Sequence, residues 1–305
     1  RIVPCPIGAM QSLRRYPKMK ITKVLSALAL LLALLSGCTE PVVSVSQPPY
    51  IDLNAIPAWE GQPYFIIDDN TPGFTELDLT TDAFERYSAL DARGRCGSAY
   101  ACVSEALLAD EDRGSLASIT PSGWVNRQYD FIDGKYLYNR CHLLGFQLTG
   151  NSASKRNLIT GTRYLNIQGM LPFENQVADH VKDHSHHVLY RVTPLFREDD
   201  LVCRGVQMEA YCVDCGNSDP FMFHVFCYNV QPGVLIDYET GESTFSEIGL
   251  NSEKKTYVLN TSSKKFHDPD CGNAANISDK NRDKVKITRE ELIYRGYEPC
   301  GVCKP

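Results

Sequence analysis

The sequence predicts an α+β fold, in which a strand–strand–helix (ββα) finger is embedded in an antiparallel sheet domain and a small domain follows at the C-terminus. Three observations support this prediction. Short runs rich in β-branched and aromatic residues recur between residues 64 and 230. A clear helical spacing of apolar residues follows Pro172. One His and three Cys stand in the last fifty residues, a segment too short to bury a large core.

The N-terminal 37 residues contain a predicted export signal. Met19–Lys23 is basic, and the apolar run Val24–Leu35 is too short to span a bilayer comfortably. The chain does not begin with Met, so we interpret the residues before Met19 as vector-derived or upstream sequence. Residues 35–38 read Leu-Ser-Gly-Cys, which resembles the bacterial lipoprotein box and implies a lipid on Cys38. An ordinary signal peptide with an incidental Cys is the alternative.

Four segments follow from these boundaries and from a polar stretch at Thr240–Lys255. Residues 1–37 are the upstream residues and signal, and residues 38–55 are the lipidated N-terminus and a Pro-containing tether. Residues 56–250 form the sheet domain, and residues 256–305 form the small C-terminal domain.

Most elements of the sheet domain are strands. The expected strands are Tyr64–Asp68, Tyr129–Ile132, Tyr136–Arg140, Asn157–Gly161, Val188–Pro194, Leu201–Val213 and Phe221–Val230. The turn at residues 217–220 predicts that the last two pair as a long antiparallel hairpin. A helix is expected over Met170–Asp183, because Pro172 suits a first turn and Phe173, Val177 and Val181 recur at helical spacing. A shorter helix is expected over Thr81–Ala89.

The residues that suggest chemistry lie on the predicted finger. Residues 139–142 read Asn-Arg-Cys-His, and Asn157, Asn166 and Glu174 follow His142 at offsets of 15, 24 and 32. An imidazole can accept a proton from water, and amide and carboxylate oxygens can bind a hard cation. The first strand would deliver His142 at its end, and the helix would bring Asn166 and Glu174 toward it. Gly169 and Pro172 interrupt the stretch between the last two, so one continuous helical face is not predicted.

Charge indicates where a polyanion would bind. The chain has a net charge of −6, and the part after residue 37 has a net charge of −12, so its surface as a whole repels nucleic acid. Residues 134–173 contain no Asp or Glu. The five basic residues in that window are Lys135, Arg140, Lys155, Arg156 and Arg163. Chance clustering is the alternative interpretation.

Three segments of the chain resemble the DNA/RNA non-specific endonucleases of the ββα-metal (His-Me finger) class, particularly the secreted and surface nucleases of Gram-positive bacteria. They are residues 138–143 (Tyr-Asn-Arg-Cys-His-Leu), 157–162 (Asn-Leu-Ile-Thr-Gly-Thr) and 165–175 (Leu-Asn-Ile-Gln-Gly-Met-Leu-Pro-Phe-Glu-Asn). The resemblance runs from about Pro57 to Tyr238. Much of the wider family has Asp-Arg-Gly-His where this chain has Asn139 and Cys141, which leaves open what supports the base.

The resemblance implies the roles of the site residues. His142 is the general base, Asn166 binds Mg²⁺, and Glu174 organises metal-bound water. Asn157 is a supporting polar residue and Arg140 is the arginine of the His motif. Arg163 is expected to contact phosphate, with Lys155 and Arg156 as further substrate-binding residues. The implied function is metal-dependent, sequence-non-specific hydrolysis of DNA, with RNA as a possible second substrate, outside the cytoplasmic membrane. No protein partner is evident.

Two other functions compete with this one. A surface DNA-binding or uptake receptor would bind DNA without metal-dependent cleavage, because its altered Asn139 and Cys141 motif would no longer cut. An extracellular metal-binding protein would bind metal through its Cys and His residues and would not respond to DNA. The presence of His142, Asn166 and Glu174 together favours the enzyme.

The C-terminal segment carries a second metal-binding pattern. His267, Cys271, Cys300 and Cys303 form a His-x₃-Cys and Cys-x₂-Cys layout that can bind Zn²⁺ tetrahedrally. Zinc would stabilise a domain with little core, and disulfide bonding is the alternative. The spacing resembles the zinc domain of Ada-type DNA alkylation-repair proteins. Because His267 stands where that family has its methyl-accepting Cys, methyl transfer is not expected.

Seven further cysteines leave several pairings open: Cys96, Cys102, Cys141, Cys203, Cys212, Cys215 and Cys227. Cys96 and Cys102 are close enough in sequence to bridge. Cys141 can be oxidised or pair with another Cys. Cys212 and Cys215 are a Cys-x₂-Cys pair that can bind a metal together with Cys203 and Cys227. The His-rich run at residues 183–187 is either part of a metal site or a set of cationic residues near a helix C-terminus, the commoner case.

Overall fold

The computed structural model describes residues 51–305, apart from residues 111, 113, 152, 217–219 and 251–252. The predicted export signal, Cys38 and most of the tether lie outside the described residues. Within the described part, no helix has both the length and the apolar character needed to cross a bilayer.

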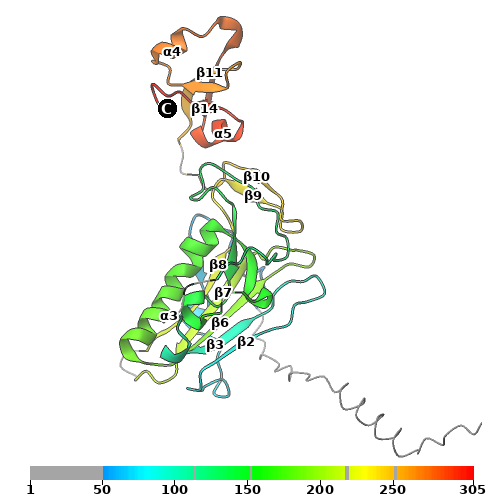
Figure 1. The fold of residues 1–305 in the computed structure, drawn as a ribbon, viewed down its shortest axis with the longest axis vertical. Coiled ribbons are helices and arrows are strands. Elements are labelled where there is room, and N and C mark those ends of the chain that lie inside the picture. Colours follow the sequence, from blue (N-terminus) through cyan, green and yellow to red (C-terminus); the bar gives the residue numbers. More distant parts are fainter. Residues whose placement is uncertain (1–50, 111, 113, 152, 217–219, 251–252) are drawn as a thin grey trace, which may run out of the picture. The chain divides into compact units, whose positions relative to one another are not determined.

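A six-stranded antiparallel sheet forms the centre of the larger domain, in the order β1-β8-β7-β6-β3-β2 (Figure 1). Its strands are β1 (Tyr64–Ile66), β2 (Phe84–Tyr87), β3 (Ala99–Val103), β6 (Val188–Leu195), β7 (Gly205–Cys212) and β8 (Met222–Tyr228). The predicted long hairpin is confirmed, since β7 and β8 pair antiparallel from Gly205↔Tyr228 to Tyr211↔Met222. The α+β fold is likewise confirmed.

The three long central strands are buried on both faces because each face has its own cover. Helix α3 (Leu171–His184) lies across one face (Figure 1), and its residues Phe173, Val177 and Val181 belong to the largest hydrophobic core. These are the residues whose spacing predicts the helix. On the other face, a smaller cluster is formed by Tyr100, Cys102 and Leu189 with Phe74 and Phe84 against them.

The predicted ββα finger is present. Strands β4 (Tyr138–His142) and β5 (Leu158–Thr162) pair antiparallel, from Tyr138↔Thr162 to His142↔Leu158. Between them lie the short helix α2 (Phe146–Thr149) and the 3₁₀ turn η3 (Lys155–Asn157). A π-helical segment, η4 (Leu165–Met170), follows β5 and leads into α3.

The helical backbone is continuous through the position where the sequence predicts an interruption. Met170 and Leu171 both have right-handed helical φ and ψ, and the Leu171 N–H donates to the Asn166 carbonyl. Pro172 is tolerated because it stands in the first turn of α3, where its missing N–H costs little. In the π turn the N–H groups bond to carbonyls five residues earlier instead of four, which accommodates the change in hydrogen-bonding pattern before α3. Asn166 and Glu174 therefore project from one uninterrupted helical stretch.

Two predicted elements are wrong. Thr81–Ala89 is not a helix: Phe84–Tyr87 is the edge strand β2, paired with β3 from Phe84↔Cys102 to Tyr87↔Ala99. Pairing with an existing sheet edge outweighs the weak helical spacing of this segment. The run 129–132 is a turn rather than a strand, because the Ile132 N–H donates to the Tyr129 carbonyl at 3.0 Å. Its apolar side chains pack against strands β9 (Val234–Ile236) and β10 (Ser243–Phe245) instead.

The C-terminal domain has a separate sheet in the order β13-β11-β12-β14. The strands are β11 (Lys255–Asn260), β12 (Lys265–His267), β13 (Arg282–Ile287) and β14 (Glu298–Pro299), with helices α4 (Gly272–Ala275) and α5 (Arg289–Tyr294). Three other 3₁₀ turns complete the described chain: η1 (Asp68–Asn70), η2 (Glu105–Leu107) and η5 (Asp279–Asn281). One small core here contains Tyr257, Leu259, Phe266, Ile287 and Leu292, as expected for a domain of fifty residues.

Candidate active site

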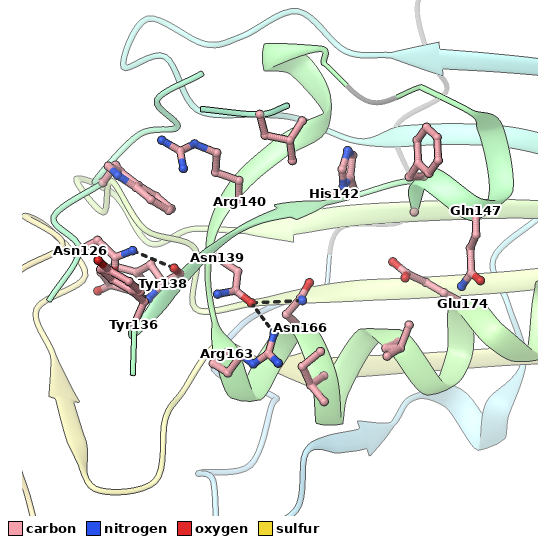
Figure 2. Close-up of a pocket in the computed structure, with 16 residues that line it drawn as sticks. Asn126, Tyr136, Tyr138, Asn139, Arg140, His142, Gln147, Arg163, Asn166 and Glu174 are labelled. Carbon is pink, nitrogen blue, oxygen red and sulfur yellow. Dashed lines mark hydrogen bonds between the residues drawn. The ribbon is translucent and has the colours of Figure 1, made fainter. Parts of the chain in front are cut away.

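An open cleft of about 890 Å³ lies between the finger strand β4 and the helical stretch η4–α3. Among the predicted site residues, those that line it are Arg140, His142, Arg163, Asn166 and Glu174. Figure 2 shows Asn166 and Glu174 projecting from the helix toward the strand that carries His142. Lys155, Arg156 and Asn157 do not line the cleft. Residues up to 34 positions apart in sequence therefore line the same cleft, because β4, β5 and the η4–α3 helix pack together.

His142 is the last residue of β4 and is only 7% exposed. It is the one imidazole among the residues that line the cleft. Tyr138, which also lines the cleft, is buried; this raises its pKa far above the usual value, and its hydroxyl donates to the Gly241 carbonyl at 3.0 Å. Tyr138 is therefore not available as a base near neutral pH, whereas an imidazole is suited to that role.

Asn157 holds the backbone that follows His142. Its side-chain oxygen accepts from the Leu144 N–H at 2.8 Å, and its side-chain nitrogen donates to the Leu144 carbonyl at 3.0 Å. Its own carbonyl accepts from the Leu143 N–H at 2.9 Å. Asn157 is fully buried, so each of these bonds satisfies a group that water cannot reach. Its position matches a supporting residue rather than one that contacts substrate.

A chain of hydrogen bonds orients the Asn166 amide. The Arg163 guanidinium can only donate, so the Asn139 atom that faces it at 3.4 Å is the side-chain oxygen. That same oxygen accepts from the Asn166 side-chain nitrogen at 3.3 Å. The Asn166 side-chain oxygen is then directed away from Asn139 and into the cleft, as the dashed lines in Figure 2 allow the reader to follow. An oxygen facing the cleft is the atom that a hard cation needs.

The sequence alone did not reveal that Asn139 orients the Asn166 amide. Asn139 departs from the Asp of the wider family, and it is placed to orient Asn166 rather than to contact the base. An Asp at this position would accept equally well from Arg163 and Asn166. The sequence spacing already indicated that Asn139 does not contact the base. Asn139 and His142 lie three residues apart on one strand, so their side chains point to opposite faces of the β4–β5 ribbon.

The arginines near the cleft already have protein partners. The Arg163 Nη2 atom lies 2.7 Å from an Asp133 carboxylate oxygen. The Arg140 Nε–H donates to the Ile119 carbonyl at 2.5 Å, and its guanidinium lies 4.4 Å from the centre of the Trp124 ring. Both side chains therefore stabilise the wall of the cleft, and a phosphate contact from either would have to compete with these bonds.

Two glycines allow the close packing of the site. An ideal Cβ on Gly145 would lie 2.8 Å from the Glu174 carboxylate, so Gly145 leaves the space that this carboxylate occupies. An ideal Cβ on Gly161 would lie 2.3 Å from the Cys141 sulfur on the paired strand. Cys141 is fully buried there. Its burial limits the access of an oxidant from solvent.

The predicted bridge between Cys96 and Cys102 is absent from the described structure. Both are free thiols. Cys102 lies in the small cluster on the outer face of the sheet, whereas Cys96 belongs to the large core on the α3 side. One disulfide is found among the described residues, between Cys212 and Cys215. Sequence separation alone could not show that the first pair lies on opposite faces of the sheet.

The predicted zinc ligands of the C-terminal domain converge. The ligand atoms of His267, Cys271, Cys300 and Cys303 all lie within 4.8 Å of one another. The backbone N–H groups of Cys303 and Val302 lower the pKa of the Cys300 thiol to about 6. Cys300 is therefore largely a thiolate at neutral pH, the form that binds metal. A compact set of one imidazole and three sulfurs fits Zn²⁺.

Comparisons with known proteins agree with this geometry. The sequence model of a family described as DNA/RNA non-specific endonuclease matches residues 78–213. The structure of NucA from Streptococcus agalactiae with a magnesium ion bound is similar, with 26% identity and a TM-score of 0.55 over 62% of this chain and 90% of NucA. NucA without metal gives 25% identity and a TM-score of 0.54 over 64% and 92% of the two chains.

A zinc-bound structure of Sda1 nuclease shares 28% identity over 53% of this chain and 81% of its own, with a TM-score of 0.45. The family match spans η2, the finger, α3 and β6–β7, and so includes every residue of the cleft discussed above. Residues 78–213 of this chain therefore carry a DNA/RNA non-specific endonuclease domain, similar in structure to NucA.

Proposed function

We propose that this endonuclease hydrolyses DNA, and RNA as a second substrate, with a divalent metal ion and without sequence preference. The observation that carries the proposal is the placement of His142, Asn166 and Glu174 on the walls of one open cleft. An open cleft admits a nucleic-acid backbone, and contacts to the backbone carry no sequence information.

The residues of the cleft fit Mg²⁺. Asn166 offers an amide oxygen and Glu174 a carboxylate, and Mg²⁺ prefers oxygen ligands and keeps several waters. When bound, the ion would supply positive charge at the scissile phosphate and at the departing 3′ oxygen. Asn166 would hold the ion and Glu174 would accept hydrogen bonds from its waters. The magnesium-bound structure of NucA supports this choice of metal.

The proton chemistry falls to His142. The neutral imidazole would take a proton from a water molecule as that water's oxygen bonds to phosphorus. The bond from phosphorus to the 3′ oxygen would break, and the departing oxygen would gain a proton from solvent. Protonation of His142 in acid would remove the base. Asn157 serves as a positioning residue, because it holds the backbone at Leu144 just beyond His142.

The basic side chains that bind the substrate can be assigned from the contacts that the arginines already make within the protein. Arg140 and Arg163 bond to the protein, so their main contribution is to shape the cleft. Lys155 and Arg156 are exposed on η3, beside the finger, and are the better candidates for attracting the strand through its phosphates. We therefore propose that Lys155 and Arg156 attract the strand at longer range and that Arg140 and Arg163 act mainly on the shape of the site.

Cleavage of a supercoiled plasmid tests the proposed function. With Mg²⁺, nicked and linear forms should appear first, followed by fragments, because a circular substrate has no ends to attack. EDTA should stop the reaction and excess Mg²⁺ should restore it. Binding of the plasmid without metal-dependent cleavage would instead support the receptor function. Parallel reactions on a structured RNA decide whether RNA is also a substrate.

A substitution at Arg163 separates orientation of Asn166 from phosphate binding. Because Arg163 fixes the Asn139–Asn166 bond, Arg163→Met is expected to raise the Mg²⁺ concentration for half-maximal rate by about 10-fold or more, as for other groups that orient a metal ligand. The KM for DNA should change little. The matched control is Arg156→Met, which should weaken DNA binding. The slope of log binding constant against log salt concentration should fall in magnitude by about 1, and the Mg²⁺ concentration for half-maximal rate should not change.

The reverse result would assign Arg163 to phosphate. If Arg163→Met raises the KM for DNA and leaves the Mg²⁺ midpoint unchanged, the orienting role is wrong. Thermal unfolding of both variants controls for damage to the fold.

The proposal extends to location and domain layout. We infer an extracytoplasmic protein anchored through lipid on Cys38, supported by the Leu-Ser-Gly-Cys sequence at residues 35–38. The catalytic unit is assigned to residues 56–250. Residues 256–305 are assigned as a domain that Zn²⁺ stabilises through His267, Cys271, Cys300 and Cys303, supported by the convergence of their ligand atoms.

A further inference from the structure

A second group of metal-binding side chains lies at the opposite end of α3 from the catalytic residues. It consists of His180, His186, Cys212 and Cys215, whose ligand atoms all lie within 4.8 Å of one another. We propose that this group, in its dithiol form, is a structural zinc site of the nuclease domain. The site is independent of the proposed catalytic metal and of the C-terminal cluster.

The spacing of the donor atoms matches a tetrahedral ion. His180 Nε2 and His186 Nδ1 are 3.3 Å apart, and the Cys215 sulfur lies 3.1 Å from the first and 3.3 Å from the second. Zinc bonds of 2.0–2.1 Å to nitrogen and 2.3 Å to sulfur give tetrahedral edges of roughly 3.3–3.8 Å. Two imidazoles and two thiolates are a donor set typical of structural zinc.

The fold brings these residues together from two separate regions. His180 stands in the last turns of α3, and the chain then reverses at Ser185, which has the left-handed φ of 55° common at helix ends. This reversal returns His186 toward His180. Cys212 ends β7, next to the start of β6 through the pair Val188↔Cys212, and Cys215 lies in the turn toward β8.

Neighbouring groups hold the donors in place. The His180 ring stacks on Phe221, with centroids 4.3 Å apart and planes 13° apart. His187 is turned to the other side: its Nδ1 lies 2.8 Å from the Asp214 carboxylate, and its backbone N–H donates to the same carboxylate. Asp214 is one of the two residues between Cys212 and Cys215, so its pairing with His187 holds this loop in place. His187 is therefore not counted as a ligand.

The disulfide between Cys212 and Cys215 and the zinc site exclude each other. A zinc ion requires two separate thiolates, so the disulfide must first be reduced by a thiol reductant, which supplies two electrons and two protons and is itself oxidised to a disulfide. Each thiol would release its proton when Zn²⁺ binds, and no electron moves in that step. The two sulfurs, which are bonded to each other in the disulfide, would have to separate to the edge of about 3.8 Å that two zinc-bound thiolates span, whereas the two imidazole nitrogens are already at the distance that a shared ion requires.

The position of the site indicates what it would do. It would link the C-terminal end of α3 to the β7–β8 hairpin. The N-terminal end of α3 carries Glu174 and continues into the segment with Asn166. Zinc would therefore brace the helix that presents these two residues, at a distance from the catalytic cleft.

Metal content of the full chain tests the proposal without relying on nuclease activity. Protein purified under reducing conditions in the Cys300→Ser/Cys303→Ser background, which disables the C-terminal cluster, should retain one zinc ion per chain by mass spectrometry of the metal. Substitution with Co²⁺ should give the absorption bands of a tetrahedral ion with two thiolate ligands. Adding His186→Ala should remove both signals, because His186 lies in a partly exposed loop and its loss should leave the fold intact.

The matched control is His187→Ala in the same background, which should keep the ion. Retention of zinc by the His186→Ala variant would overturn the proposal. So would a metal-free reduced chain, or a disulfide at residues 212 and 215 that forms in the presence of zinc and is detected by alkylation under denaturing conditions. Circular dichroism of each variant separates loss of a ligand from loss of the fold.

Discussion

His142→Ala is expected to lower the rate of plasmid cleavage by about 10²–10⁴-fold, the usual contribution of a general base. His142 supplies the one imidazole among the residues that line the cleft. The fold should survive, because His142 ends a strand at the edge of an open cleft of about 890 Å³. Initial rates on supercoiled DNA at saturating Mg²⁺ provide the measurement.

Chemical rescue distinguishes a catalytic role from a structural one. Free imidazole can enter the open cleft of the His142→Ala variant and take the proton, so added imidazole should restore part of the rate. Asn166→Ala is the comparison, because its defect should respond to Mg²⁺ concentration and not to imidazole. A His142→Ala enzyme that cuts at the full rate, or one that is inactive because it is unfolded by thermal melting, would contradict this assignment.

The largest expected effect on stability comes from the buried ion pair of Arg191 and Glu209. The Arg191 Nε and Nη2 atoms lie 2.9 and 3.1 Å from the two Glu209 oxygens, and both side chains are at most 1% exposed. Glu209 also accepts from the Gly73 N–H at 2.8 Å, which fastens the segment before β2 to the sheet. Glu209→Gln leaves a buried guanidinium without its charge partner. The free energy of unfolding should fall by about 3–5 kcal/mol.

Urea denaturation measures this loss, and two variants sharpen it. Asp199→Asn removes the acidic partner of the exposed Arg93 and should change stability very little. The double variant Arg191→Met/Glu209→Leu replaces the pair with apolar side chains and should be more stable than Glu209→Gln, because no buried charge is left unpaired. If Glu209→Gln unfolds at the same urea concentration as the wild type, the pair does not support the fold as described.

The ββα finger could be predicted because local sequence specifies local geometry. A strand ending near His142, a second strand at Asn157–Gly161 and the helical spacing after Pro172 were enough to predict the ββα finger, which the structure contains. The hairpin of β7 and β8 followed from a turn between two long β runs in the same way. Each of these inferences uses residues that are close in the chain.

The errors concern features that depend on distant partners. The segment 81–89 is a strand because β3 offers an edge to pair with, and nothing in the segment itself records that edge. The sequence also did not indicate that Arg163 lies 2.7 Å from Asp133 and donates to Asn139; its predicted phosphate contact stays a prediction. The pairing of the cysteines depended on which face of the sheet each one occupies.

By itself, the sequence determined the order of the finger elements. It also singled out His142, Asn166 and Glu174, which the structure places in one cleft, and the four C-terminal His and Cys residues whose ligand atoms converge. Only the tertiary structure decided how the Asn166 amide is turned, which arginines are already engaged, and that His180 and His186 meet Cys212 and Cys215. The physical reason is that backbone periodicity is encoded in neighbouring residues. The direction of an amide or the partner of a charge is set instead by side chains that only folding brings within hydrogen-bond distance.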